Sequence, residues 1–245
     1  MQVIRLRADR ANSGVGVRPE GQIRAERSNL MWNNPQISLE EIKKPSVVLS
    51  HEVSVQVSYC GICGSDFLLT AKKEAGSMSY SGLSALPVVL GHEFSGMRED
   101  TEELVAVEES IYCGECVDCH EGREKFCKFV EKIGFTKNGA YASHVIVPKK
   151  NCWSLASLVQ NFDADTALRM GALIQPYAIS YSALFGKIVR AWLPGDRVLI
   201  PGAGPIGFAT ADLALAAGAA EVAVVEPQAN RAELVKNIGV DYVCS

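Results

Sequence analysis

Hydrophobic and polar residues alternate along several short stretches in the first part of the chain, which is typical of half-buried β-strands. The stretch 51–59 carries valine at three alternate positions, and shorter stretches at 36–42 and 145–147 are also expected to be strands. The residues before them include Arg5 and Arg7 and are expected to form a solvated, mobile end. This pattern predicts a first domain made mainly of β-sheet.

A helical pattern replaces the alternation from Asp163 to Leu193, a stretch rich in Ala, Leu and Ile. Asp163 or Asp165 is expected to cap the start of this helix, and the Pro-Gly pair after Leu193 is expected to end it. We place a domain boundary near residue 160, which gives two domains, 1–160 and 161–245.

Beyond the helix, an apolar strand at 198–201 runs into a G-x-G-x-x-G motif and then into a second helical stretch at 208–217. This order of strand, glycine loop and helix is typical of dinucleotide binding. The glycines permit a tight turn and a close approach, and the helix N-terminus faces the pyrophosphate. The candidate cofactor-binding glycines are Gly202, Gly204 and Gly207.

An acidic residue follows the next apolar strand, 221–225. Glu226 lies about 20 residues past the glycine motif, where a carboxylate accepts hydrogen bonds from the ribose hydroxyls of adenosine. Because a carboxylate repels the 2′-phosphate of NADP, the sequence favours NAD.

Four cysteines crowd into fifteen residues with the spacing C-x₂-C-x₂-C-x₇-C. Four thiolates so close together can fill every coordination position of a tetrahedral Zn²⁺, which predicts a closed, structural zinc site. Unligated cysteines or two disulfides are the alternatives. An iron–sulfur cluster would usually have a different spacing and a proline where this chain has Lys128. The candidate ligands are Cys113, Cys116, Cys119 and Cys127.

A second group of metal-binding residues lies upstream of these cysteines. Cys63 is part of CGICGSD, and His92 with Glu93 is part of LGHEFSG, and glycines flank both groups. One thiolate, one imidazole and one carboxylate leave a coordination position for water or a substrate oxygen. They therefore predict a catalytic zinc site.

Composition and charge narrow the range of partners. The chain has 245 residues, a net charge of −4 and a pI near 5.7, so it lacks the basic character of a nucleic-acid-binding protein. No apolar run reaches the ~20 residues that span a bilayer, and the charged start has no signal-peptide core. Thiolate metal sites without a secretion signal predict a protein of the reducing cytoplasm.

Several motifs follow one another along the chain: GICGSD, LGHEFSG, the four cysteines, NGAYASHVIVP, ALIQP and PGAGPIG. In these motifs the chain resembles the zinc-dependent medium-chain alcohol and polyol dehydrogenases over almost its whole length, with features closest to the inositol and inosose dehydrogenases. The resemblance implies an α/β protein with a GroES-like β-barrel catalytic domain, followed here by an incomplete Rossmann doubly wound parallel sheet. It also implies zinc and NAD as cofactors and a small polyol or cyclitol as substrate.

The same resemblance assigns roles to individual residues. Cys63, His92 and Glu93 would hold the catalytic zinc. Ser65 would hydrogen-bond the alcohol oxygen and relay its proton, and Asp66 would orient His92. Residues that would contact NAD are Gly202, Gly204, Gly207, Glu226 and Arg231.

The chain departs from this family in three places. Polyol enzymes have a histidine where this chain has Leu68 and a glutamate where it has Gln175, so both proton transfer and zinc binding would weaken. The chain also stops at Ser245, after three of the six strands of a dinucleotide fold, which leaves the strand 198–201 as an apolar edge that favours self-association.

Two hypotheses follow from these features. The first is a zinc-dependent oxidoreductase that transfers a hydride from a secondary alcohol of a polyol or cyclitol to NAD. The second is a truncated, catalytically inactive member of the family that binds structural zinc alone.

Overall fold

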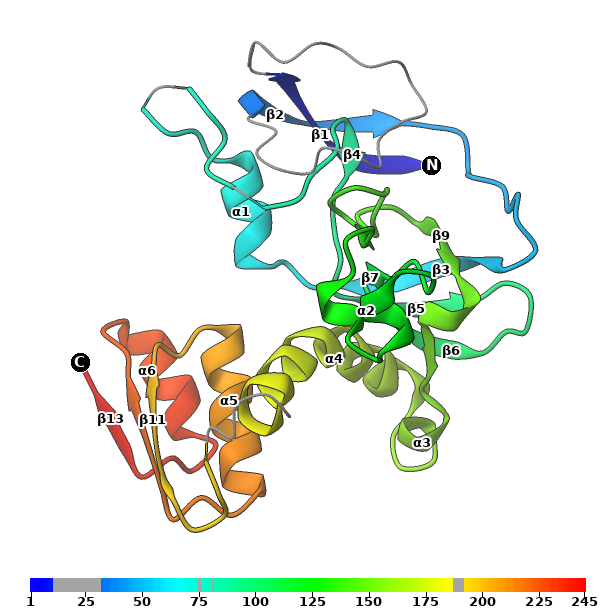
Figure 1. Cartoon of the computed structure of the whole chain (residues 1–245). Helices are drawn as coiled ribbons and strands as arrows, with labels where there is room; N and C mark the ends of the chain where they lie inside the picture. The colour runs from blue at the N-terminus through cyan, green and yellow to red at the C-terminus, as the bar shows by residue number, and fades with distance from the viewer. Residues whose placement is uncertain (11–31, 75, 81, 187–191) are drawn as a thin grey trace. The chain divides into compact units, whose positions relative to one another are not determined.

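In the computed structural model, strand β3 (Glu52–Cys60) lies inside a five-stranded antiparallel sheet with the order β10-β6-β5-β3-β9 (Figure 1). The structure describes residues 1–10, 32–74, 76–80, 82–186 and 192–245. Val53 and Val55 of β3 are fully buried and pack with Phe94 and Val105, as the alternating pattern predicts. The other strands of this sheet are β5 (Phe94–Arg98), β6 (Leu104–Val107), β9 (His144–Pro148) and β10 (Cys152–Ser154).

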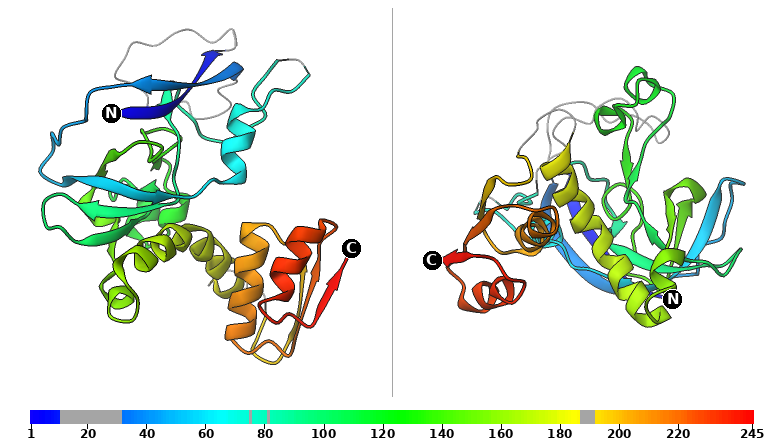
Figure 2. Two further views of the ribbon diagram at one scale, coloured as in Figure 1. Left: turned by 180° about the vertical axis from the view of Figure 1, so that it is seen from behind. Right: turned by 90° about the horizontal axis from the view of Figure 1, so that it is seen from below.

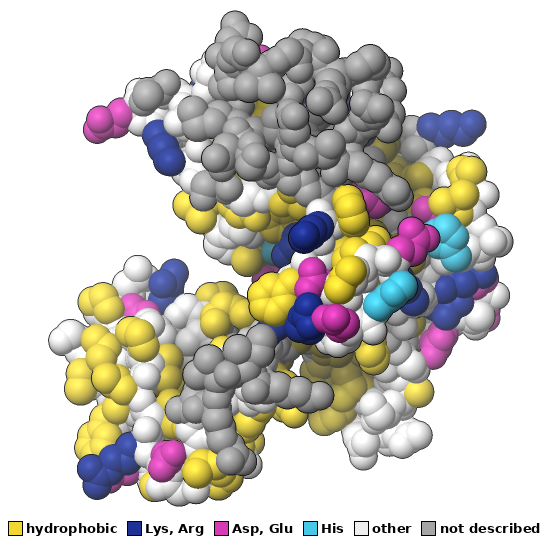
Figure 3. Space-filling model, viewed as in Figure 1, with side chains coloured by type: hydrophobic (Ala, Val, Ile, Leu, Met, Phe, Trp, Pro, Cys, Tyr) yellow, Lys and Arg dark blue, Asp and Glu magenta, His cyan; other side chains and the backbone are white. Residues whose placement is uncertain are grey.

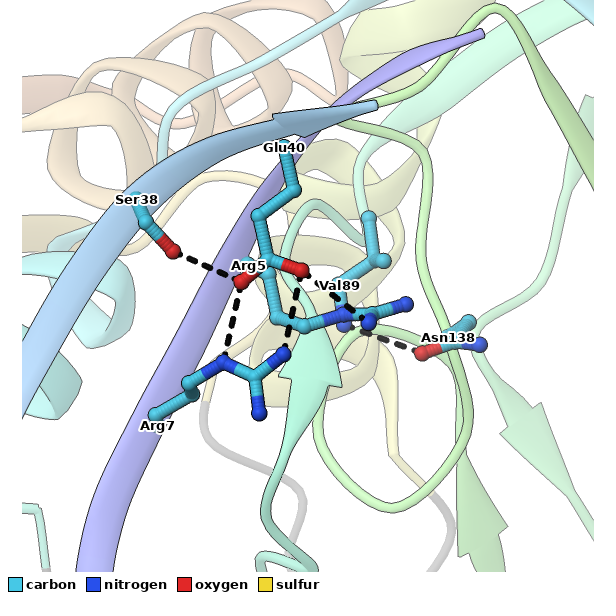
Figure 4. Close-up of polar contacts among 6 residues, drawn as sticks. All are labelled: Arg5, Arg7, Ser38, Glu40, Val89 and Asn138. Carbon is cyan, nitrogen blue, oxygen red and sulfur yellow. Dashed lines mark hydrogen bonds and ion pairs between the residues drawn. The ribbon is translucent and has the colours of Figure 1, made fainter. Parts of the chain in front are cut away.

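The N-terminal segment is a strand, β1 (Gln2–Arg10), and the prediction of a mobile end is wrong. It pairs with β2 (Trp32–Glu41) and β4 (Val88–Val89), and Leu6 is fully buried. Arg7 donates hydrogen bonds of 2.9 and 3.1 Å to Glu40, and Arg5 donates a third of 3.2 Å (Figure 4). The Arg7 guanidinium lowers the pKa of Glu40 to about 2. Cross-strand pairing thus gives the arginines a structural role.

Short elements connect these sheets. Helix α1 (Gly64–Thr70) follows β3 directly, and a cysteine-rich loop leaves the five-stranded sheet after β6. The remaining short elements of this part are β7 (Ser110–Ile111), α2 (Val117–His120), η1 (Glu124–Phe126), β8 (Glu131–Lys132), η2 (Lys149–Asn151) and α3 (Ala156–Val159).

The long helix α4 (Ala164–Phe185) begins where the sequence pattern predicts, because Asp163 Oδ1 accepts a 3.0 Å hydrogen bond from the backbone of Thr166. The prediction that it continues to Leu193 is wrong. The helix ends at Phe185. At the next residue, Gly186, a Cβ atom would lie 2.5 Å from the Ser182 carbonyl oxygen, so the backbone there has a conformation that glycine fits and larger residues do not. Residues 187–191 lie outside the described residues. No helix in the described part of the chain has the length and apolar character that crossing a bilayer requires.

The chain divides into two compact units, Met1–Ala172 and Leu173–Ser245, so α4 contributes to both. The second unit is a parallel sheet with the order β11-β12-β13. The connecting helices α5 and α6 lie side by side on one face of this sheet (Figure 2). The arrangement confirms the prediction of a partial Rossmann sheet. Its elements are β11 (Arg197–Pro201), α5 (Pro205–Ala216), β12 (Glu221–Val225), α6 (Ala229–Lys236) and β13 (Tyr242–Cys244).

The two faces of the parallel sheet differ in burial. Ile200, Val222 and Val224 are buried under the helices, whereas Leu199 and Tyr242 on the other face are 69% and 55% exposed. Apolar side chains gather on this second unit in the space-filling view (Figure 3). Among the described strands β11 pairs with β12 alone, so the predicted apolar edge is present.

Candidate functional site

Strand pairing brings the upstream metal-binding residues together. Cys60 at the end of β3 lies opposite Phe94 at the start of β5, so the residues just after β3 face those just before β5. As a result, one ligand atom each from Cys63, His92 and Glu93 can be chosen so that all lie within 4.8 Å of one another. His92 and Glu93 are buried, with 3% and 6% exposure, and Cys63 is half-buried.

Two glycines make room for this arrangement. A Cβ atom on Gly61 would lie 2.6 Å from a carboxylate oxygen of Glu93, so a larger residue there would displace that carboxylate from its present position. Gly91 has a φ of +93°, a backbone conformation that glycine adopts readily and other residues rarely do. The turn places His92 and Glu93 at the end of β3.

Asp66, in the first turn of α1, faces His92. Asp66 Oδ1 and His92 Nδ1 lie 3.8 Å apart, and neither buried atom has a hydrogen-bond partner among the described residues. The other carboxylate oxygen of Asp66 accepts hydrogen bonds from the Cys63 backbone at 3.0 Å and from the Tyr141 hydroxyl at 2.8 Å. The opposite imidazole nitrogen, Nε2, lies 3.5 Å from Ser65 Oγ. Asp66 and Ser65 therefore lie near different nitrogens of the His92 ring.

Burial perturbs the ionisable groups of this site. It raises the pKa of the Glu93 carboxyl and of the Cys63 thiol, because the charged forms lose hydration. It also raises the pKa of Cys60 to about 12, so this thiol stays protonated, and its sulfur lies 3.6 Å from the Gly61 carbonyl oxygen. A divalent cation would offset the cost of ionising Cys63 and Glu93. Sulfur, nitrogen and oxygen donors, with unpartnered atoms behind the imidazole, fit a zinc ion.

The four cysteines of the downstream cluster, which we call the cysteine lobe, also converge. Their sulfur atoms all lie within 4.8 Å of one another, with separations of 3.5 Å for Cys116–Cys119, 3.5 Å for Cys113–Cys127 and 3.9 Å for Cys113–Cys119. A tetrahedral zinc with bonds of about 2.3 Å to sulfur places its ligands about 3.8 Å apart. The lobe therefore has the dimensions of a closed zinc site.

Electrostatics in the cysteine lobe favour a bound cation. A backbone N–H of Glu115 donates to Cys113 Sγ at 3.5 Å and lowers the pKa of that thiol to about 6. Desolvation and the neighbouring sulfurs raise the pKa of Cys119 to about 12. Neighbouring thiols at these distances cannot all ionise together unless a cation balances their charges.

The glycine motif of the second unit forms the predicted loop between β11 and α5. Gly202 has a φ of +98°, and Gly204 is the N-cap of α5. A Cβ atom on Gly207 would lie 1.9 Å from the Gly202 carbonyl oxygen, so this helix and loop approach closely only with glycine there. The N-terminus of α5 thus faces a loop that can admit a phosphate group.

Glu226 lies at the carboxyl end of β12 and is tied to the glycine loop. Its carboxylate accepts 2.8 Å hydrogen bonds from the backbone N–H groups of Ala203 and Gln228. These amides, and to a smaller extent Arg231, lower the pKa of Glu226, so the group is a carboxylate at neutral pH. Beside it lies a cavity of about 400 Å³ at the carboxyl ends of β12 and β13, the side on which such sheets bind ligands.

The structure also locates the two residues that differ from the polyol enzymes. Leu68 lies one turn after Ser65 on α1 and is half-exposed, and Gln175 lies on α4 in the second unit. One neighbour of the metal site was not predicted, namely Tyr141, which contacts Asp66. It lies within NGAYASHVIVP, and the tyrosine after its glycine and alanine was the available signal.

Comparison with known proteins gives consistent matches. Residues 49–157 match the family described as Alcohol dehydrogenase GroES-like domain. Over 230 residues, covering 87% of this chain and 58% of the relative, the chain is 36% identical to scyllo-inosose 3-dehydrogenase of Thermotoga maritima. An L-threonine 3-dehydrogenase of Saccharopolyspora erythraea is 31% identical, with 84% and 58% covered. The chain therefore spans somewhat more than half the length of these relatives.

A solved structure agrees with these sequence matches. A protein of Thermotoga maritima assigned as an alcohol dehydrogenase superposes with a TM-score of 0.87 at 33% identity, covering 100% of this chain and 66% of that one. A GroES-like unit followed by a parallel sheet with a glycine loop is the architecture of an alcohol dehydrogenase-like oxidoreductase. The chain belongs to the family of zinc-dependent medium-chain alcohol and polyol dehydrogenases.

Proposed function

We propose that this chain carries the zinc-binding catalytic unit and the first part of the NAD-binding unit of a dehydrogenase that oxidises a secondary alcohol of a polyol or cyclitol. The observation that carries the proposal is the convergence of Cys63, His92 and Glu93 beside Ser65. Scyllo-inosose 3-dehydrogenase, the relative at 36% identity, favours a cyclitol as substrate.

Each residue of the site would have a separate role in the reaction. When bound, zinc would polarise the substrate oxygen and NAD would accept the hydride. Cys63, His92 and Glu93 would hold the metal. Ser65, whose Oγ lies 3.5 Å from His92 Nε2, would hydrogen-bond the alcohol oxygen and relay its proton, accepting it while its own hydroxyl proton passes to water. Asp66 would keep His92 oriented from the opposite side of the ring.

The cofactor assignment rests on the second unit. The glycine loop and the N-terminus of α5 would bind the pyrophosphate of NAD. The ionised carboxylate of Glu226, together with Arg231 on α6, would face the adenosine ribose. A fixed negative charge there disfavours the 2′-phosphate of NADP, so we assign NAD.

A second candidate function is that of a catalytically inactive family member that binds structural zinc. Leu68 is the specific observation that favours it, because a half-exposed leucine one turn beyond Ser65 cannot pass a proton to solvent. The open face and free edge of the sheet at Leu199 would, in either case, promote self-association.

One assay separates the two candidates. Purified protein loaded with zinc is mixed with NAD and, in turn, inositols, inososes, L-threonine and simple polyols, and NADH is followed by its absorbance. Turnover with a cyclitol, and with NAD in preference to NADP, supports the proposal. Absence of turnover with every substrate, while zinc remains bound to the cysteine lobe, supports the inactive alternative.

A further inference from the structure

Tyr141 lies beside the candidate catalytic zinc site without belonging to its metal-binding residues. Its hydroxyl oxygen lies 2.8 Å from Asp66 Oδ2 and 3.1 Å from the Gly61 carbonyl oxygen. A phenol has one proton to donate, and a hydrogen bond to a carboxylate is stronger than one to a neutral carbonyl. The Tyr141 proton therefore goes to Asp66.

This hydrogen bond determines how the Asp66 carboxylate is turned. Oδ2 also accepts the backbone N–H of Cys63 at 3.0 Å, so two donors from separate segments hold the same oxygen. The other oxygen, Oδ1, is then directed to His92 Nδ1, 3.8 Å away. Neither of these two buried atoms has another hydrogen-bond partner among the described residues. Without the Tyr141 hydroxyl, the carboxylate would have one donor fewer to hold it in this orientation.

The backbone fixes the position of the Tyr141 ring as well. Its N–H donates to the Leu90 carbonyl at 2.8 Å, and its carbonyl accepts from the Ile4 N–H at 2.9 Å. Gly91 leaves the space for the ring, because a Cβ atom there would lie 2.6 Å from the ring carbon Cδ1. The turn that carries His92 thus also determines where Tyr141 lies.

We infer that Tyr141 is a positioning residue for the catalytic zinc: it holds Asp66 so that the free carboxylate oxygen faces His92 and keeps that imidazole in its metal-binding orientation. The inference rests on the proposed function, which it deepens. Groups that orient a metal-binding histidine typically change metal affinity about 10- to 100-fold. Because Tyr141 acts through Asp66, we expect an effect near the lower limit, about tenfold.

The test compares metal binding by the wild-type chain and by Tyr141→Phe, which removes only the hydroxyl. Both proteins are loaded with Co²⁺, and loss of Co²⁺ to a chelator is followed by visible absorption. Cobalt in the cysteine lobe absorbs through its four thiolates and serves as an internal reference for folding. We expect Co²⁺ affinity at the Cys63 site to fall about tenfold, with the lobe unchanged.

Two further variants separate positioning from general stability. Tyr177→Phe is the matched control, because Tyr177 donates an equally long 2.8 Å hydrogen bond to Asp212 in the second unit. It should leave Co²⁺ affinity at both sites unchanged. In an Asp66→Ala background, Tyr141→Phe should cause no additional loss, since its effect passes through Asp66.

The outcomes are distinguishable. Equal Co²⁺ retention at the Cys63 site in wild type and Tyr141→Phe would overturn the role of Tyr141 while leaving the proposed function intact. Parallel loss from both sites would also overturn it, since that result indicates a structural effect. A wild-type chain that binds Co²⁺ in the lobe alone would overturn the proposed function, and the inference with it.

Discussion

The cysteine lobe and the Cys63 site both offer thiolate to a metal, but they are built in different ways. All four sulfurs of the lobe come from one segment of fifteen residues, and most residues of this segment are exposed. The Cys63 site joins two segments through the pairing of β3 and β5, and its imidazole and carboxylate are buried. The lobe offers four candidate ligands and the Cys63 site three.

Because of this difference, we expect metal in the lobe to contribute to stability and metal at the Cys63 site to contribute to reactivity. A closed set of four thiolates leaves no position for substrate, so metal there can only hold the loop in place. Three ligands leave a coordination position open for water or a substrate oxygen, and Asp66 Oδ1 lies 3.8 Å from His92 Nδ1 with no other hydrogen-bond partner among the described residues. Substitutions should therefore affect stability at the lobe and reactivity at the Cys63 site.

The largest effect is expected from Cys127→Ser, which removes the buried thiolate of the lobe. Structural zinc supplies about 10–16 kcal/mol to small zinc domains. Losing a quarter of that would lower the Tm by about 10 °C. Calorimetry would measure the fall in Tm, and zinc analysis would measure the loss of bound metal. Cys244→Ser, at an exposed thiol, is the control and should change neither. An unchanged Tm in Cys127→Ser would mean that the lobe holds no structural metal.

His92→Gln should have the opposite profile. Removing the imidazole should abolish metal binding at the Cys63 site and lower kcat by about 10³-fold, because metal polarisation contributes several kcal/mol. The Tm should fall far less than in Cys127→Ser. Steady-state kinetics with the preferred alcohol, alongside calorimetry, would show this. Full activity in the variant would show that His92 is not a ligand of the catalytic metal.

Leu68→His should raise turnover, because it restores a proton acceptor one turn beyond Ser65. Proton transfer by a positioned group contributes about 10²-fold or more. The gain should be greatest near neutral pH and shrink as hydroxide takes over in alkaline solution. Leu68→Asn is the matched control, since it adds polarity without a titratable group. Identical pH–rate profiles for the two variants would eliminate the relay argument.

The smallest effect is expected at Glu226, far from the metals in sequence. The backbone N–H groups of Gln228 and Ala203 hold its pKa in the folded protein below the usual value of 4.5. Its contribution to stability is therefore fully present above about pH 4.5 and is lost as the pH falls through the lowered folded pKa. Glu226→Gln points an amide N–H at one of the two backbone donors, so it should be less stable near neutral pH. As acid protonates the Glu226 carboxylate of the wild type, the free energies of unfolding of the two proteins should become equal. A difference that stays constant as the pH falls would contradict this.

The two sites also differ in how well the sequence alone predicts them: local motifs are readable, whereas contacts between distant segments are not. The four-cysteine spacing and the glycine loop are local, so their residues were identifiable without a fold, and the structure brings the lobe sulfurs together. The pairing of β1 with β2 could not be predicted. Arg5 and Arg7 make the segment look like a solvated end, and Glu40, which pairs with both of them, lies far along the chain. Tyr141 was missed for a similar reason, since its contact with Asp66 spans 75 positions.

If both candidate sites bind metal, one chain holds a closed zinc site and an open one. The most direct measurement is zinc content during timed exposure to a chelator, in wild type and in His92→Gln. We predict two zinc ions per wild-type chain, one released quickly and one retained, and a single retained ion in His92→Gln. Two ions of equal resistance in wild type, or a quickly released ion that persists in His92→Gln, would contradict the account.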